Sequence, residues 1–151
     1  MEHGEQAPDF HLLDQNNVQH QLTDYKGRKV LLYFYPKDMT PGCTTQAKEV
    51  RDHWQELKDL ELVVLGVSTD SVESHKTFAE KHELPFPLLA DTDKEVVNRY
   101  GVWKEKQMFG NTYMGIQRDA FLIDEQRNIM RHFEKVQPKK FVHLVKQELD
   151  R

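Results

Sequence analysis

The only cysteine of the chain is Cys43, which ends the segment PKDMTPGC at positions 36–43. A thiolate is a strong nucleophile, and its reactivity depends on the charges around the sulfur. Thr40, three residues earlier, offers a hydroxyl group, while Pro36 and Pro41 stiffen the loop and can shield the sulfur from water. The segment therefore favours nucleophilic sulfur chemistry. The plain alternative is that Cys43 only fills space in the core, as many free cysteines do.

The residues that follow have the periodicity of a helix. Cys43, Ala47, Val50, Trp54 and Leu57 fall at i, i+4, i+7, i+11 and i+14, which forms one apolar stripe. Cys43 then lies in the first turn of the helix. A helix N-terminus presents unpaired N–H groups and the positive end of the helix dipole, and both stabilise a thiolate. The position of Cys43 alone thus begins to activate it.

Short apolar runs predict the strands that carry this helix. Buried strands are expected at 29–35 and 62–68, a shorter one at 88–89, and a neighbouring pair at 120–123 and 129–133. Residues 10–13 and 18–22 flank a polar turn and predict an N-terminal β-hairpin. Strands alternate with helices early and pair as neighbours late, so the fold class is α/β with a mixed β-sheet flanked by helices.

Capping signals place the remaining helices. Asp70 and Glu73 have capping-box spacing for a helix that ends near residue 82. Asp91 or Asp93 is expected to cap a helix that ends before Gly101. A last amphipathic helix begins at 138. The stretch 104–107 is interpreted as a solvated connection, with Trp103 and Phe109 either near the entrance to the site or in ordinary packing.

Length and charge limit the function classes. The chain has 151 residues, which predicts one domain over 1–151, and 21 Lys and Arg against 25 Asp and Glu give a net charge of −4. This acidic balance argues against nucleic-acid or anionic-membrane partners. The chain has no apolar stretch near the roughly 20 residues of a membrane span, and its polar start lacks a signal-peptide pattern, so we expect a cytoplasmic location.

No cofactor or metal is expected. One cysteine excludes an internal disulfide and a four-cysteine metal site. The eight histidines show no metal-ligand spacing and are interpreted as solvated or half-buried.

Three motifs resemble one family. The pattern Pro36-x3-Thr40-x2-Cys43 resembles the active-site motif of peroxiredoxins, and YFYPKDMTPGCTTQA is similar to the peroxiredoxin Q (bacterioferritin comigratory protein) branch. APDF at 7–10 resembles the family's opening, and YMGIQR at 113–118 followed by FLID at 121–124 resembles its arginine region. The matches occur in the expected order over nearly the whole chain. The resemblance implies a thioredoxin-like fold with an N-terminal hairpin, and it implies reduction of hydrogen peroxide and alkyl hydroperoxides.

The resemblance also implies roles for four residues. Cys43 is the peroxidatic cysteine, Thr40 its hydroxyl partner, Arg118 the charge stabiliser and Pro36 the shield. An arginine suits that role because negative charge grows on the departing oxygen as the O–O bond breaks. The plainer readings are a helix cap for Thr40 and an ordinary surface residue for Arg118.

Two positions depart from the branch. Many members carry a second, resolving cysteine five residues after the first, where this chain has Lys48. An external thiol must then resolve oxidised Cys43: a low-molecular-weight thiol, glutaredoxin, thioredoxin or another protein. A second copy of the chain is a further option, so we expect a monomer or weak homodimer. Gln46 stands where relatives often have Glu, and we expect a modest effect.

Three other functions make different demands on the sequence. A disulfide oxidoreductase needs a Cys-x-x-Cys pair, whereas positions 43–46 read CTTQ. A cysteine hydrolase needs a histidine partner that the spacing does not offer. A peroxide sensor or redox-relay binding protein on the same fold stays open, because the resolving cysteine is missing.

Overall fold

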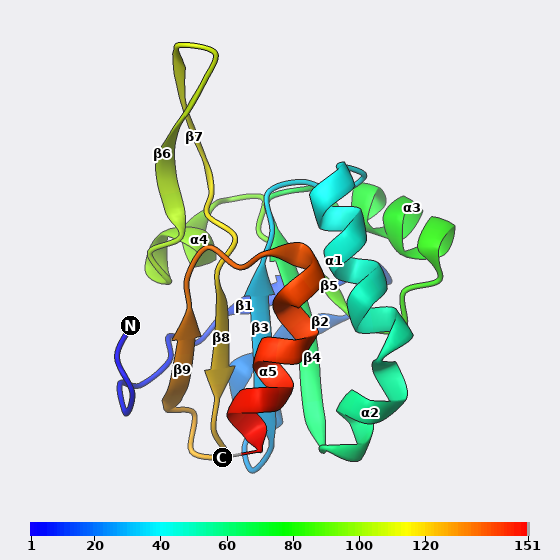
Figure 1. The fold of residues 1–151 in the computed structure, drawn as a ribbon, viewed down its shortest axis with the longest axis vertical. Coiled ribbons are helices and arrows are strands. Elements are labelled where there is room, and N and C mark those ends of the chain that lie inside the picture. Colours follow the sequence, from blue (N-terminus) through cyan, green and yellow to red (C-terminus); the bar gives the residue numbers. More distant parts are fainter. Residues whose placement is uncertain (151) are drawn as a thin grey trace.

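The computed structural model describes residues 1–150 and is built around a seven-stranded mixed sheet (Figure 1). The strand order is β2-β1-β5-β4-β3-β8-β9. The strands are β1 (His11–Leu13), β2 (Gln19–Gln21), β3 (Lys29–Phe34), β4 (Leu62–Ser68), β5 (Leu88–Ala90), β8 (Ala120–Ile123) and β9 (Ile129–Phe133). The three central strands β3, β4 and β5 run parallel, and the outer strands pair antiparallel. The α/β class, the mixed sheet and the N-terminal hairpin are therefore confirmed.

Helices cover both faces of this sheet. They are α1 (Pro41–Asp52), α2 (Trp54–Asp59), α3 (Val72–His82), α4 (Glu95–Arg99) and α5 (Phe141–Leu149), with short 3₁₀ turns at Leu22–Tyr25 and Pro138–Lys140. Side chains of α1, α2, α3 and α5 share one buried cluster, and those of α4 share the other with the N-terminal segment. No helix within residues 1–150 is long and apolar enough to cross a membrane.

Strand β3 sends alternate side chains into the two buried clusters. Leu31 and Tyr33 pack with α1 and α5, whereas Leu32 and Phe34 pack on the α4 side. Every residue of β4 is buried, as expected for a parallel strand covered on both faces. The loop that leaves β3 leads directly into α1.

The apolar stripe after the loop spans two helices and not one. Helix α1 ends at Asp52, and α2 begins at Trp54 after His53, which leaves the helical region with φ −107°. The stripe survives the break: Cys43, Val50 and Leu57 are buried, and Trp54 packs against the cluster at partial exposure. Apolar residues at helical spacing mark the buried face of a helix. Because the break between α1 and α2 keeps this face toward the core, the apolar spacing continues across both helices.

Two capping predictions are corrected and one is confirmed. Helix α3 is capped by Ser71, whose hydroxyl accepts the Ser74 N–H at 3.1 Å, so Asp70 is not the cap. At α4 the N-cap residue is Lys94, so neither Asp91 nor Asp93 holds that position, although the Asp91 carboxylate accepts the Val97 N–H at 2.8 Å. Gly101 follows α4 with φ +69°, as a helix stop requires.

The interpretation of 104–107 as a simple connection was wrong. Strands β6 (Trp103–Met108) and β7 (Asn111–Ile116) form a separate antiparallel hairpin, here called the arm, which rises from the body in Figure 1. Phe109 and Gly110 form its turn, both with positive φ, and Phe109 is 96% exposed. The arm is missed because most of its side chains are exposed, so no alternation of buried and polar residues marks it as a strand pair.

Candidate active site

Cys43 lies at the start of α1, as predicted. Thr40 is the N-cap residue, Pro41 opens the helix, and Cys43 belongs to the first turn. The side chain is 2% exposed and joins the cluster between the sheet and α1. In Figure 1 this end of α1 and the base of the arm lie at the same end of the molecule.

Arg118, which stands between β7 and β8, reaches Cys43. Its Nη2 lies 3.4 Å from the Sγ of Cys43, and its Nη1 donates to Oε1 of Gln46 at 2.7 Å. Cys43 and Gln46 are three residues apart and share one face of α1. Gly42 permits this approach, because a Cβ at that position would lie 3.1 Å from Nη2. The Arg118 guanidinium therefore contacts both the Cys43 thiol and the Gln46 side-chain amide.

The backbone on either side of Arg118 is held by β9 and the loop that follows it. The Arg118 carbonyl accepts the Val136 N–H at 2.7 Å. The buried Asp119 carboxylate accepts the Lys135 N–H at 3.0 Å and contacts Nε2 of His132 at 2.8 Å. Burial raises the pKa of Asp119, but hydrogen bonds from His132, Lys135 and Gln117 outweigh it, so this pKa lies below its ordinary value. The carboxylate is therefore a fixed anchor.

A buried polar network holds the loop that carries Pro36 and Thr40. The Asp38 carboxylate accepts the Tyr35 hydroxyl at 2.6 Å and contacts Nδ1 of His75 at 2.7 Å. The Asp38 N–H donates to Asp70 at 2.8 Å. Sequence reasoning missed this network and interpreted the histidines as solvated or half-buried, whereas His75 is 0% exposed.

The network also brings together three groups of the kind that bind metals. Ligand atoms of Asp38, Asp70 and His75 lie within 4.8 Å of one another. Nε2 of His75 faces the Leu89 carbonyl at 3.0 Å, so both ring nitrogens face oxygen atoms. These contacts tie the loop to α3 and β5. The sequence offers no fixed spacing that could have located this cluster, because its members come from two loops and from α3.

Thr40 and Pro36 belong to the segment between β3 and α1. The Thr40 hydroxyl donates to the Lys37 carbonyl at 2.7 Å, and its oxygen makes no capping bond to the helix. Pro36 is half-buried between β3 and the loop. Lys48, at the position where relatives carry a resolving cysteine, is exposed on α1.

Two buried donor groups near the thiol have no hydrogen-bond partner among the described residues: the Tyr33 hydroxyl and Nε2 of Gln46. Burial, followed by the nearby Cys43 and Asp38, holds the pKa of Tyr33 well above its ordinary value. The Tyr33 hydroxyl therefore keeps its proton.

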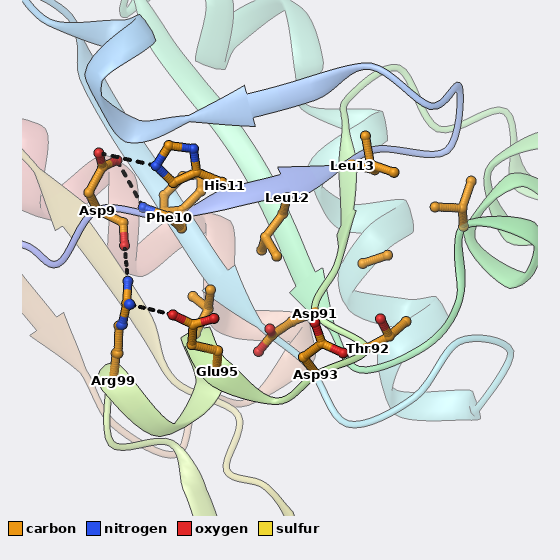
Figure 2. A pocket seen from close by; sticks show the side chains of 13 residues that line it. Asp9, Phe10, His11, Leu12, Leu13, Asp91, Thr92, Asp93, Glu95 and Arg99 are labelled. Atoms are coloured by element: carbon orange, nitrogen blue, oxygen red, sulfur yellow. Dashed lines mark hydrogen bonds and ion pairs between the residues drawn. The ribbon is translucent and has the colours of Figure 1, made fainter.

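A cavity on the opposite side of the sheet from Cys43 is lined by β1 and the start of α4 (Figure 2). Its volume is about 400 Å³, and its walls are rich in carboxylates. These polar groups already serve the fold: the Asp91 carboxylate accepts the Val97 N–H of α4, and Nη1 of Arg99 donates to the Asp9 carbonyl at 3.2 Å. Figure 2 shows Arg99 bridging Asp9 and Glu95 along one wall. No cysteine lines this cavity, so the thiol chemistry is assigned to the Cys43 site.

Comparison with known proteins identifies the family. The AhpC/TSA family model matches residues 3–132. Peroxiredoxin Bcp of Bacillus subtilis is 46% identical over 94% of this chain and 90% of its own, and Peroxiredoxin Bcp of Escherichia coli is 51% identical over 87% and 84%. The solved structure of Xanthomonas campestris bacterioferritin comigratory protein superposes with a TM-score of 0.91 at 32% identity, covering 99% of this chain and 98% of that one.

These likenesses agree with the geometry: a thioredoxin-like sheet presents one buried cysteine at a helix start, with an arginine against its sulfur. The chain therefore belongs to the AhpC/TSA family, in its peroxiredoxin Q/Bcp branch, and is a thiol-dependent peroxidase.

Proposed function

We propose that Cys43 is the peroxidatic nucleophile and that Arg118 stabilises the charge that develops on the departing oxygen. One observation carries this proposal: the Arg118 guanidinium lies 3.4 Å from the Sγ of Cys43 at the N-terminus of α1. A fixed cation of this kind is a large source of transition-state stabilisation in a water-poor site. Gln46 orients the guanidinium, because it accepts a hydrogen bond from the other Nη.

The substrate class is hydrogen peroxide and organic hydroperoxides. The Cys43 thiolate attacks one oxygen of the O–O bond, the bond breaks, and the sulfur becomes a sulfenic acid. The other oxygen leaves with the electron pair and takes a proton, which gives water or an alcohol. Thr40 directs its hydroxyl toward the reacting oxygen, in exchange for its present contact with Lys37. Pro36 shields the sulfur on the β3 side of the loop.

An external thiol completes the cycle. Cys43 is the only cysteine, so the sulfenic acid condenses with a thiol from outside the chain, releases water, and forms a mixed disulfide. A second thiol then releases the Cys43 thiolate. We propose a low-molecular-weight thiol, glutaredoxin or thioredoxin as reductant, in a cytoplasmic setting. Residues 1–151 act as one domain, in a monomer or weak homodimer.

Stopped-flow oxidation tests the proposal. Reduced protein is mixed with hydrogen peroxide, Trp fluorescence follows the reaction, and mass spectrometry reads the oxidation state of Cys43. We expect fast second-order formation of a sulfenic acid that is absent in Cys43→Ser. A rate equal to that of a free thiol would remove Cys43 from peroxidatic chemistry.

A turnover assay separates the enzyme from a peroxide sensor, the alternative that the missing resolving cysteine favours. With thiol donors present, an enzyme consumes many equivalents of peroxide for each chain, and we expect this result. A protein that stops after one equivalent with every donor would be a sensor or relay.

A further inference from the structure

A cationic cavity lies beside Arg118, between the base of the arm and the loop that follows β9. Its volume is about 480 Å³. Four cationic side chains line it, and one carboxylate, Glu105, stands among them. The cations are Lys104, Lys106, Arg118 and Lys135. The whole chain carries a net charge of −4, so this local excess of positive charge runs against the average surface.

Lys106 connects the cavity electrostatically to the reactive sulfur. The Lys106 side chain crosses the neighbouring strand β7, because a Cβ added to Gly115 would lie 3.3 Å from the Cδ of Lys106. Burial lowers the pKa of Lys106, Arg118 lowers it further, and the nearby Cys43 raises it. Lys106 and Arg118 line the same cavity, and the charge of Cys43 influences the ammonium group. Glycine at position 115 leaves the room that this path requires.

Lys135 lines the wall of the cavity that faces the arm. Its N–H is bonded to Asp119, and the next residue, Val136, donates its N–H to the Arg118 carbonyl. The wall and the arginine thus belong to one bonded unit, while Lys104 and Lys106 approach from the arm. The other lining residues include Gln107, Tyr113 and Gln117, so the walls are mainly polar.

From this arrangement we propose that the cavity between the arm and Lys135 binds an anionic, low-molecular-weight thiol and delivers it to oxidised Cys43. The inference rests on the proposed function and names its reductant: a peptide-sized thiol with more carboxylates than ammonium groups, of which glutathione is the probe. The cations attract and orient the carboxylates, and the thiol then reaches the sulfur past Arg118. The polar walls favour this occupant over a fatty hydroperoxide, which needs an apolar surface.

The chemistry balances with two equivalents of thiol. The first thiolate attacks the sulfur of Cys43–SOH, an S–S bond forms, and the S–O bond breaks; the departing hydroxide takes the proton that the thiol lost on ionisation and leaves as water. The second thiolate attacks the sulfur of the bound thiol, and the Cys43 thiolate leaves. The sulfenic sulfur is reduced to thiolate, and two thiols are oxidised to one disulfide.

A binding experiment tests the site without any peroxide chemistry. S-methylglutathione is titrated into the Cys43→Ser protein by calorimetry, and the double variant Lys104→Glu/Lys135→Glu is compared with it. We expect saturable binding that weakens at least about fivefold in the double variant and at higher salt. The control Lys58→Glu/Lys76→Glu, which reverses two charges at exposed positions of α2 and α3, is expected to bind normally. Absence of binding, or equal binding by all three proteins, would overturn the inference.

A kinetic experiment tests delivery of the thiol. Sulfenic acid formed with one equivalent of hydrogen peroxide is mixed with glutathione or with its diethyl ester, in which both carboxylates are neutral. We expect the double variant to slow glutathione at least about fivefold while the ester is unchanged. Equal rates for the two thiols in the parent protein would overturn the inference.

The peroxide step separates this inference from the proposed function. Oxidation by hydrogen peroxide is expected to be unaffected in the double variant. If this step were slow in the parent protein, the proposed function would fail while the binding experiment still decided the site. If the variant instead slowed only a carboxylated hydroperoxide, the cavity would be a substrate site and the inference would be overturned.

Discussion

The start of α1 and the arm both approach Arg118, but they are built in opposite ways. Around α1, Cys43 and Gln46 are buried, and the loop before them is held by the bonds of Asp38 to Tyr35 and His75. The arm pairs with no other strand, and its tip residue Phe109 is 96% exposed. The comparison separates two tasks. Attack on a peroxide needs a fixed, water-poor site, whereas capture of a thiol from solution needs an accessible one.

The same comparison bears on how a chain with one cysteine could be reduced. The Cys43 side chain is 2% exposed, so a small thiol needs less opening of the site than glutaredoxin or thioredoxin would. Arg118 borders both the sulfur and the cationic cavity. In our two proposals Arg118 therefore serves the peroxide step and also lies on the path of the small thiol.

The largest effect is expected at the residue that the two regions share. Arg118→Met removes the cation beside the departing oxygen, so the second-order rate with hydrogen peroxide should fall at least about tenfold. The fold should persist, because the backbone of residue 118 keeps its bond to Val136. Stopped-flow oxidation measures the rate, and circular dichroism checks the fold. An unchanged rate in a folded variant would contradict the proposal that Arg118 stabilises the departing oxygen.

The next effect concerns stability and falls on Asp119. Asp119→Asn removes a carboxylate that accepts bonds from Lys135, Gln117 and His132, so the free energy of unfolding should drop by about 1–3 kcal/mol. Urea denaturation measures the change. Asp119→Ala is not an equivalent test, because it removes all acceptors and leaves a space as well.

The pH dependence of that effect has a definite sign. The folded-state pKa of Asp119 lies below its ordinary value, so its contribution is complete above about pH 4, the range of an unfolded aspartate. The contribution is lost as pH falls through the folded-state pKa. The difference in stability between the parent protein and Asp119→Asn should therefore shrink below about pH 4. A difference that grows on acidification would contradict the anchor role.

A smaller kinetic effect is expected at Gln46. Gln46→Leu removes the acceptor that orients Arg118, and the peroxide rate should fall by about fivefold, the equivalent of one hydrogen bond. Gln46→Glu keeps an acceptor oxygen at the same place, so its rate should stay within about threefold of the parent. The pair is measured side by side in the same stopped-flow assay. A larger loss in the Glu variant than in the Leu variant would show that the charge on Arg118, and not its orientation, is what Gln46 controls.

The two regions also mark where sequence reasoning succeeds. The buried strands, the N-terminal hairpin and the helix start at Cys43 follow from apolar runs and periodicity, because burial leaves a pattern in the sequence. The arginine position came from the motif at 113–118 and lies against the sulfur. The arm left no such pattern, and neither did the network of Asp38, Asp70 and His75, since polar side chains that meet across loops have no fixed spacing.

The smallest effect is expected at the tip of the arm, where Phe109 and Gly110 both have positive φ, at 52° and 80°. Two-residue turns of this kind favour Asn followed by Gly, and an exposed phenylalanine gains little from packing. Phe109→Asn should therefore keep stability within about 0.5 kcal/mol of the parent or raise it slightly, and should leave the peroxide and glutathione rates unchanged. Thermal unfolding and the two stopped-flow assays measure these quantities. A marked loss of either rate would mean that the tip of the arm closes over the site during the reaction. The arm would then not be the open element that we contrast with the fixed site at the start of α1.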